Sequence, residues 1–326
     1  MVRIATTSMG NYHASEHYRI QGPFERMVED NLIVFDRLSD QDIADGELSE
    51  YDIFFFWNPS HPKSLAYIKA AQLAKCKVWI DFDDNWSEIP MYHPHSWRTN
   101  PAFQKELNKK IVSEADVVTV TTKELHQLGK QYNKNTHIVP NALPHKITKD
   151  HRKKNKVIGW RGSDRHMEDI RNGMKGLVKD ERLHYHFVGF SPWYLYDAKI
   201  DYSYTTWSNS LQEYFNNLYT INMEYCWIPM INNVFNRSVS NIALLEATSV
   251  GAVCIVPEWL EEFNVGHSLW YKNHKELKTI LTKIANNELD EVRNRYLTEC
   301  VKVINEKFVL NETNKIRKNI IECVIN

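Results

Sequence analysis

A cluster of acidic residues follows the apolar run 78–80. Asp81, Asp83 and Asp84 stand within four positions of one another, and Trp86 comes two positions after Asp84. Carboxylates this close repel one another unless a cation, sugar hydroxyls or other donors compensate their charge. The cluster is open to three interpretations: a D-x-D metal site, a general base facing an acceptor hydroxyl, or solvation with helix capping by Asp84. Asp83 and Asp84 are the catalytic candidates, and Asp81 and Trp86 would contact the acceptor.

The turn after the first apolar run carries a second group of polar side chains, from Ser8 to His13. Ligands of an open parallel sheet bind beyond the carboxyl ends of its strands, so this turn should face the ligand. Asn11 and Arg19 could contact an acceptor there, Arg19 by meeting an anion, and His13 is a further catalytic candidate. Ordinary loop and helix-cap roles are the alternative. The turn lacks G-x-G-x-x-G, which disfavours a dinucleotide site.

In the second half, a glycine-containing turn joins an apolar run to a helical pattern. Gly162 and Ser163 lie where the helix would offer unpaired amides and a positive dipole to an anion. Arg161 and Arg165 would add positive charge for a diphosphate. An ordinary strand-to-helix turn is the alternative interpretation.

A polar loop, 229–239, runs into a helical pattern whose apolar face contains a lone glutamate. Ser240 and Asn241 at the start of this helix can hold phosphates through hydroxyl and amide groups. Glu246 can accept hydrogen bonds from both hydroxyls of a ribose. The alternative is a solvated glutamate, although its neighbours are apolar.

Alternating apolar runs and helical patterns must position these groups. In the first half they predict strands at 3–7, 32–36, 51–57, 77–82, 117–121 and 137–139, and helices at 16–30, 64–73, 101–112 and 123–132. After a polar stretch they predict strands at 156–160, 184–189, 201–205, 223–228 and 252–256, and helices at 166–179, 210–218, 240–250 and 275–285. The chain is helical and amphipathic from 289. Apolar strands separated by helices predict parallel sheets covered on both faces, here an α/β protein with two Rossmann-like domains facing a cleft.

Composition narrows the classes of protein that fit. A length of 326 residues favours two domains. With 40 basic and 41 acidic side chains, the chain lacks the excess of positive charge expected of a protein that coats nucleic acid or anionic membranes. No apolar run approaches the roughly 20 residues that span a bilayer, and the start lacks the apolar region of a signal peptide. We therefore expect a cytoplasmic protein without a transmembrane segment.

Several segments, in the same order along the chain, resemble the GT-B glycosyltransferases, particularly the family-four-like "glycosyl transferases group 1". Segment 80–90 is similar to their DDxxxxxP stretch, 117–125 to vTvsTxxL, 139–142 to vPNG/A, and 158–163 to iGwxGS. The loop and helix around Glu246, followed by Gly251 and an apolar run, look like their nucleotide-sugar site. The resemblance covers most of the chain.

The resemblance implies an N-terminal acceptor domain (1–145), a linker (146–156), a nucleotide-sugar domain (157–307) and a terminal helix (308–326) that packs back on the first domain. It implies metal-independent transfer with retention, with a nucleotide sugar as substrate and no cofactor. The acceptor is open among a polysaccharide, a lipid-linked sugar and a hydroxymethylated base in phage DNA. A metal-dependent D-x-D transferase and a non-catalytic GT-B module that binds a sugar or a partner are the alternative functions.

The chain departs from the family pattern at three positions. Glu246 matches the second glutamate of E-x7-E, the ribose ligand, but Ser238 replaces the first. Val239 and Ala243 replace the lysines of KSNxKxxE, which contact phosphate. That task would pass to Arg237, Arg161, Arg165 and backbone amides.

Overall fold

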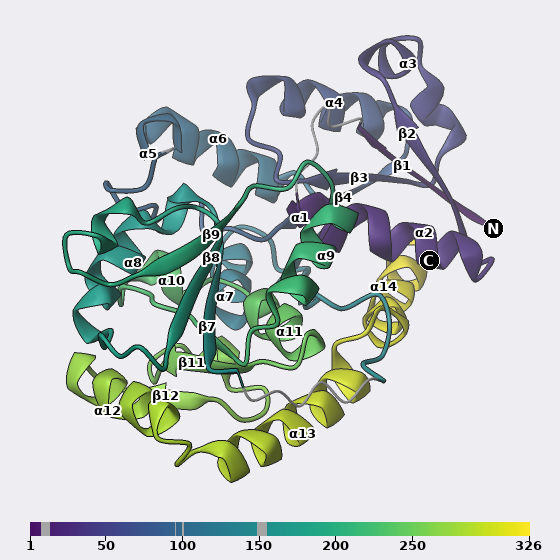
Figure 1. The fold of residues 1–326 in the computed structure, drawn as a ribbon. Coiled ribbons are helices and arrows are strands. Elements are labelled where there is room, and N and C mark those ends of the chain that lie inside the picture. The colour runs from purple at the N-terminus through teal and green to yellow at the C-terminus, as the bar shows by residue number, and fades with distance from the viewer. Residues whose placement is uncertain (8–13, 95, 100, 149–154) are drawn as a thin grey trace.

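The computed structural model describes residues 1–7, 14–94, 96–99, 101–148 and 155–326 (Figure 1). Among these residues the strands form two six-stranded parallel sheets, one in each half of the chain. The first sheet has the order β2-β1-β3-β4-β5-β6 and the second β12-β11-β10-β7-β8-β9. The first comprises β1 (Val2–Thr7), β2 (Ile33–Leu38), β3 (Ile53–Trp57), β4 (Lys77–Phe82), β5 (Val117–Val120) and β6 (Thr136–Ile138). The second comprises β7 (Val157–Gly162), β8 (His184–Gly189), β9 (Tyr202–Thr206), β10 (Tyr225–Trp227), β11 (Val253–Pro257) and β12 (Leu269–Tyr271).

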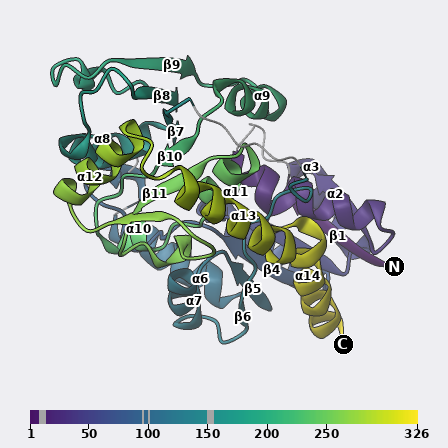
Figure 2. The same ribbon diagram turned by 60° about the horizontal axis from the view of Figure 1, so that its bottom comes forward.

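Helices flank both sheets, as expected of the predicted α/β class, which the structure confirms (Figures 1 and 2). In the first domain they are α1 (Ala14–Glu16), α2 (Gly22–Glu29), α3 (Asp40–Ala44), α4 (Pro62–Leu73), α5 (Ser96–Thr99), α6 (Ala102–Ser113) and α7 (Lys123–Lys130). In the second they are α8 (Met167–Gly173), α9 (Leu211–Ile221), α10 (Val234–Arg237), α11 (Ile242–Ser249), α12 (His274–Ala285) and α13 (Asp290–Lys307). The last helix is α14 (Leu310–Ile325).

The strand orders mark where a ligand should bind. Renumbered within its domain, the second sheet has the order 3-2-1-4-5-6, so the direction of strand addition reverses between β7 and β10. In the first sheet the reversal lies between β1 and β3. Open parallel sheets bind ligands at the carboxyl ends of the strands beside such a reversal. Each domain therefore presents one crevice to the other.

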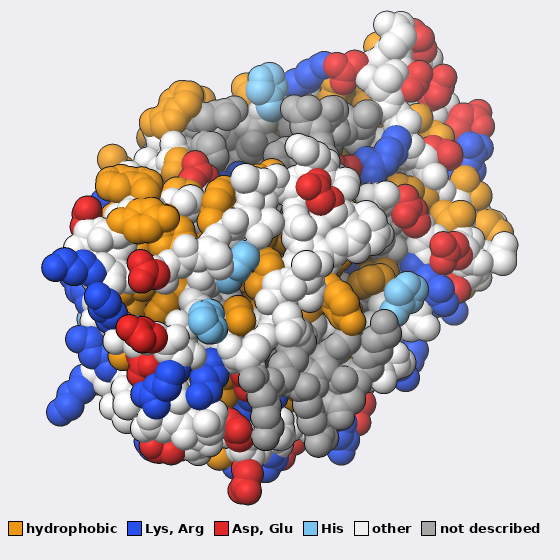
Figure 3. All heavy atoms as spheres, viewed as in Figure 1, with side chains coloured by type: hydrophobic (Ala, Val, Ile, Leu, Met, Phe, Trp, Pro, Cys, Tyr) orange, Lys and Arg blue, Asp and Glu red, His pale blue; other side chains and the backbone are white. Residues whose placement is uncertain are grey.

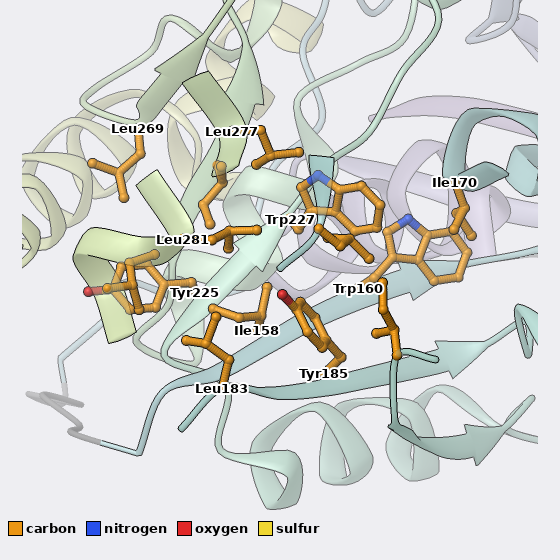
Figure 4. Packing of buried hydrophobic residues seen from close by; sticks show 14 of the residues in the cluster. Ile158, Trp160, Ile170, Leu183, Tyr185, Tyr225, Trp227, Leu269, Leu277 and Leu281 are labelled. Atoms are coloured by element: carbon orange, nitrogen blue, oxygen red, sulfur yellow. The ribbon is translucent and has the colours of Figure 1, made fainter. Parts of the chain in front are cut away.

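Apolar side chains cover both faces of each sheet. All five residues of β3 are buried, which is why its sequence is continuously apolar rather than alternating. In the second domain, Trp160, Tyr185 and Trp227 pack with Leu277 and Leu281 of α12 on one face (Figure 4). A further cluster, including residues of α11, covers the opposite face.

The final helix crosses back to the first domain, as predicted. Backbone hydrogen bonds of 2.8 Å from Leu143 N to Phe308 O and of 2.9 Å from Leu310 N to Leu143 O tie the two crossing segments together. Ile320 and Ile321 of α14 then pack into the core of the first sheet, and α14 lies beside α2 (Figures 1 and 2). The predicted domain boundaries themselves stay predictions.

Two details of the second domain differ from the sequence prediction. Strand β12 was not predicted, because its three residues are too few to show a period. The helix predicted over 166–179 ends earlier, at Gly173, and a 3₁₀ turn follows over Met174–Gly176. Gly173 lies so close to Trp227 that an added Cβ would come within 2.6 Å of the indole. At Gly176 an added Cβ would likewise come within 2.6 Å of Leu277, so the chain packs closely at both glycines where the α-helix gives way to the 3₁₀ turn.

None of the helices in the described part of the chain is long and apolar enough to cross a membrane.

A candidate active site between the two domains

A cavity of about 330 Å³ lies between the domains, at the carboxyl ends of strands from both sheets. Its volume is within the range of small-molecule sites. From the first domain it is lined by Ser15, Tyr18, Asp83, Asp84, His93 and Asn141. From the second it is lined by Arg161, Gly162, Ser163, Arg165, His166, Val188, Gly189, Trp207, Ser208, Ser210, Tyr214, Met230, Phe235, Val239, Ser240, Ile242, Ala243, Glu246 and Phe263. The predicted strand ends therefore meet at one cavity.

Glu246 on α11 is held by three side chains at the cavity wall. Its Oε1 accepts a hydrogen bond of 2.6 Å from the hydroxyl of Tyr18, which belongs to the other domain. Its Oε2 accepts one of 2.6 Å from the hydroxyl of Tyr214 and lies 2.7 Å from Nη2 of Arg161. Because the side chain is only 3% exposed, its charge needs such donors. Burial raises the pKa of both tyrosines, so both hydroxyls stay protonated and donate.

The predicted contact of Glu246 with a ribose stays a prediction, and the geometry shows what it would require. Both carboxylate oxygens already accept hydrogen bonds from the protein, so a ribose would have to replace one of the donors. Tyr18 is the donor that comes from the first domain. Tyr214 and Arg161 belong to the same domain as Glu246.

Arg161 combines a structural contact with an unused donor. Its Nη2 pairs with Glu246, while its Nε is buried and meets no hydrogen-bond acceptor within the described residues. A buried donor without a partner is costly unless a ligand or water satisfies it. Arg161 lines the cavity, so an anion there would meet its positive charge.

The turns after β7 and β8 form the part of the wall best suited to phosphate. Ser163 caps the 3₁₀ turn after β7 by accepting a hydrogen bond of 3.4 Å from the backbone N of Arg165. Gly189 has a φ of +92°, and a Cβ at this position would come within 2.4 Å of the carbonyl oxygen of Gly162. Glycine is therefore required where the two turns approach each other. Backbone and hydroxyl groups remain accessible there.

Asp83 faces this wall from the first domain. Its Oδ1 accepts hydrogen bonds from Nε1 of Trp57 at 3.1 Å and from Nδ2 of Asn58 at 2.6 Å. Burial and the neighbouring charge of Asp84 raise the pKa of Asp83 to about 6. Such a carboxylate is suited to take a proton from a substrate hydroxyl near neutral pH. Asp84 is exposed and lies 3.9 Å from Arg165 across the cavity.

The predicted acceptor contacts of Arg19 and Asp81 are wrong. Nε and Nη2 of Arg19 donate to the two oxygens of Asp81 at 2.9 and 2.6 Å, and the side chains are 1% and 2% exposed. Thr119 also donates to Asp81, at 2.6 Å. The pair is a buried structural ion pair, which leaves Asp81 no free oxygen with which to begin the alternative D-x-D metal site. Among the described residues, no cluster of three or more histidine, cysteine or acidic side chains could hold a metal ion.

Three further predicted residues lie outside the cavity lining. Trp86 packs against Phe82 and Tyr132, with ring centroids 6.3 and 5.9 Å apart, and its predicted acceptor contact stays a prediction. Asn241 is buried at the start of α11, and Nε of Arg237 donates to Asn232 on the surface. Asn11 and His13 lie outside the described residues. The cavity brings together Asp83, Asp84, Arg161, Gly162, Ser163, Arg165, Ser240 and Glu246.

Sequence reasoning missed the tyrosines that hold Glu246 and the asparagine that meets Ser240. Nδ2 of Asn141 donates to Oγ of Ser240 at 2.9 Å across the domain boundary. Tyr18 lies in a π-helical turn, His17–Gln21, an irregularity that often marks functional sites. Only Asn141 carried a signal, because it belongs to the segment that resembles vPNG/A.

No family model and no curated protein matches the chain. Several solved structures match the chain. A crystal structure of Anabaena HepE in complex with UDP and glucose has a TM-score of 0.69 and 10% identity, and covers 99% of this chain and 100% of HepE. A mutant of T4 phage BGT in complex with UDP-glucose has a TM-score of 0.58 and 16% identity, with 100% of each chain covered. An OtsA apo structure has a TM-score of 0.63 and 9% identity, with 99% of each chain covered. The chain has the GT-B glycosyltransferase fold, as the sequence resemblance implied.

Proposed function

We propose that this chain is a glycosyltransferase that moves a sugar from a nucleotide-sugar donor to a hydroxyl acceptor. The observation that carries the proposal is the cavity that places Glu246 and Arg161 of one domain opposite Asp83 of the other. The fold supports it, because the solved structures of HepE and T4 phage BGT, which share this fold, contain UDP, glucose or UDP-glucose.

The donor would bind on the second domain. The turns after β7 and β8, the Ser240 hydroxyl and Arg161 would hold the diphosphate, and Arg165 at the rim would add charge. The ribose would take the place of the Tyr18 hydroxyl on Glu246. These groups stabilise the charge that develops on the departing nucleoside diphosphate, which is the main catalytic task in such a transfer.

The acceptor hydroxyl would approach from the side of Asp83. Oδ1 of Asp83 is held by Trp57 and Asn58, which leaves Oδ2 to accept a proton. The cavity lies between the domains, so closure around the donor would exclude water and limit hydrolysis.

The stereochemical outcome follows from which group takes the acceptor proton. The family resemblance implies retention, with the leaving phosphate as the proton acceptor. Asp83 carries the second candidate, a single displacement with inversion in which the carboxylate is the base. The anomeric configuration of the product, read by NMR before mutarotation, decides between the two.

Metal independence is also part of the proposal, because Arg161 and Arg165 supply positive charge where a divalent ion would otherwise act. EDTA should leave turnover unchanged. Loss of turnover in EDTA would favour the metal-dependent alternative. The acceptor is a hydroxyl of a polysaccharide, a lipid-linked sugar or a hydroxymethylated base in phage DNA, encountered in the cytoplasm. Mass spectrometry of duplex DNA carrying hydroxymethylated bases tests the last of these, and an unchanged mass would reject it.

A thermal-shift screen of UDP-, GDP-, dTDP- and CMP-sugars tests donor binding. A ligand present at 100 times its Kd stabilises the folded state by about 2.7 kcal/mol, so one class should raise the Tm clearly. Glu246→Ala should abolish the shift, whereas Glu258→Ala, which removes an exposed carboxylate paired with Lys272, should retain it. No shift with any donor would contradict the proposal. A shift without release of nucleoside diphosphate to any acceptor would favour the non-catalytic alternative.

A further inference from the structure

A row of exposed aromatic side chains leads from the cavity along one edge of the second domain. We call Trp193, Tyr196, Tyr202, Tyr204 and Trp207 the aromatic row. Four of its members are strongly exposed: Trp193 by 59%, Tyr196 by 61%, Tyr204 by 39% and Trp207 by 54%. In Figure 3 hydrophobic side chains gather on the left of the displayed face, over the region where Figure 1 labels α8 and β9. Exposed aromatic groups of this kind mark binding surfaces.

The members of the row are neighbours in space. Trp193 begins a 3₁₀ turn, in which residues three apart lie one above the other, so Tyr196 extends from the same side. The ring of Tyr196 lies 4.9 Å from that of Tyr202, at an interplanar angle of 35°. Tyr202 and Tyr204 are two residues apart on β9 and therefore share one face of the strand.

The row is continuous with the cavity. The hydroxyl of Tyr204 donates a hydrogen bond of 3.0 Å to the carbonyl oxygen of Gly189, and Gly189 lines the cavity. Trp207, just beyond the end of β9, lines the cavity as well and packs on Gly189. Strand β9 is the last strand of its sheet, so its outer edge has no neighbouring strand among the described residues. From Tyr204 to Trp207 the chain extends by about 10 Å, at roughly 3.3 Å per residue.

The charges beside the row decide which ligand it suits. Between positions 190 and 210 the charged residues are Asp197, Lys199 and Asp201, with a net charge of −1. Nucleic acid and anionic lipid surfaces require clustered lysine and arginine, which this segment lacks. A pyranose ring has an apolar C–H face that stacks on an aromatic ring and hydroxyls at its rim that hydrogen-bond to tyrosine. The row offers both kinds of contact, and its segment carries no cluster of positive charge.

We propose that the aromatic row binds a neutral saccharide chain and directs one end of it into the cavity. Binding by the row is a property of the second domain's surface. The role of the saccharide as acceptor rests on the proposed transferase function, and it selects a polysaccharide from the acceptors named above.

Affinity gel electrophoresis tests the binding. The full chain is run through native gels that contain pullulan, dextran, glucomannan or xyloglucan, beside gels without polymer. We expect at least one polymer to retard the wild type, and the double variant Trp193→Ala/Tyr196→Ala to lose at least tenfold in affinity. Tyr219→Ala removes an equally exposed tyrosine from α9, outside the row, and should migrate as the wild type does.

Three results would overturn the inference: no retardation by any of the four polymers, equal retardation of the double variant, or a wild-type dimer that the double variant converts to a monomer in sedimentation. The last result would make the row an interface between copies. Binding of UDP, GDP, dTDP and CMP by the wild type and the same variants, measured by calorimetry, separates this inference from the proposed function. Saccharide binding without nucleotide binding would contradict the transferase, whereas nucleotide binding without saccharide binding would contradict the role of the row.

Discussion

The hydroxyl of Tyr18 lies 2.6 Å from Oε1 of Glu246, and this hydrogen bond joins residues 228 positions apart on opposite domains. Glu246 is the residue that the family resemblance assigns to the ribose of the donor. Tyr18 therefore occupies the position that a ribose hydroxyl would take. Further contacts across the boundary, such as that from Nδ2 of Asn85 to Oγ of Ser238 at 3.0 Å, hold the domains together around the cavity.

Removal of the Tyr18 hydroxyl should strengthen donor binding. In Tyr18→Phe the ribose no longer competes for Oε1, and a competing hydrogen bond to a charged group, of at least about 1.5 kcal/mol, corresponds to at least about a tenfold lower Kd for the nucleotide. Tyr214→Phe is the matched control, because its hydroxyl contacts the same carboxylate at 2.6 Å from within one domain. Each variant should lower the free energy of unfolding by about 1.5–3 kcal/mol, as expected for a hydrogen bond to a charged group. Weaker nucleotide binding by Tyr18→Phe in calorimetry would show that Tyr18 supports the donor instead.

The buried pair of Arg19 and Asp81 should be essential for stability. Arg19→Met leaves a carboxylate buried without its cation, which costs about 3–5 kcal/mol in the free energy of unfolding. The loss of an exposed pair in Lys315→Met should change it by no more than about 0.5 kcal/mol, since Lys315 and Glu312 are solvated. Urea denaturation measures both. A small effect of Arg19→Met would mean that Asp81 is protonated or finds another donor.

The raised pKa of Asp83 predicts two pH dependences. As a base, Asp83 must be ionised, so kcat/KM should fall as the pH drops below about 6, and Asp83→Asn should lower kcat by about 10²–10⁴. The free energy of unfolding should change with pH in the direction opposite to that of kcat/KM. The folded pKa lies above the ordinary value of 3.8, so the folded state binds the proton more tightly and the contribution of Asp83 to stability rises as the pH falls from 6 toward 3.8.

Thermal unfolding at several pH values checks the stability effect. Asp83→Asn should remove this part of the pH dependence. It should also raise the Tm at pH 7, where the half-buried charge of Asp83 destabilises the folded wild type. An unchanged slope between pH 6 and pH 4 would contradict the assigned pKa.

Gly189 should tolerate no side chain. Gly189→Ala combines a left-handed φ of +92° with a Cβ 2.4 Å from the carbonyl oxygen of Gly162. Gly46→Ala is the control, because Gly46 has a φ of +89° and open space around the added atom. The control should lose about 1 kcal/mol of stability from backbone strain. Gly189→Ala should lose more and also abolish nucleotide binding. Equal losses in the two variants would show that the close approach of the turns is not required.

The sequence predicted the arrangement of strands and helices better than the contacts of the site. Continuous apolar runs such as 53–57 reveal buried parallel strands, because a strand buried on both faces needs no polar side chain. The order of elements along the chain also predicted that Asp83 follows a strand, that Glu246 lies on a helix, and that both face the cleft. Sequence reasoning could not show that Arg19 pairs with Asp81, since 62 positions separate them and either could equally face solvent. Tyr214 is likewise distant from Glu246 in the sequence, so it looked like part of an ordinary amphipathic helix.

The crossing of α14 to the first domain has a consequence for the order of folding. Ile320 and Ile321 pack in the same cluster as Ile4, Phe24 and Trp79. During synthesis, which proceeds from the N-terminus, the first sheet is complete long before these two residues emerge. Part of the apolar surface around Phe24 therefore stays uncovered until the second domain and α13 have been made. The first domain is therefore the last part of the protein to be completed. A chain truncated before α14 should expose an apolar surface on this domain, although the deletion lies at the other end of the sequence.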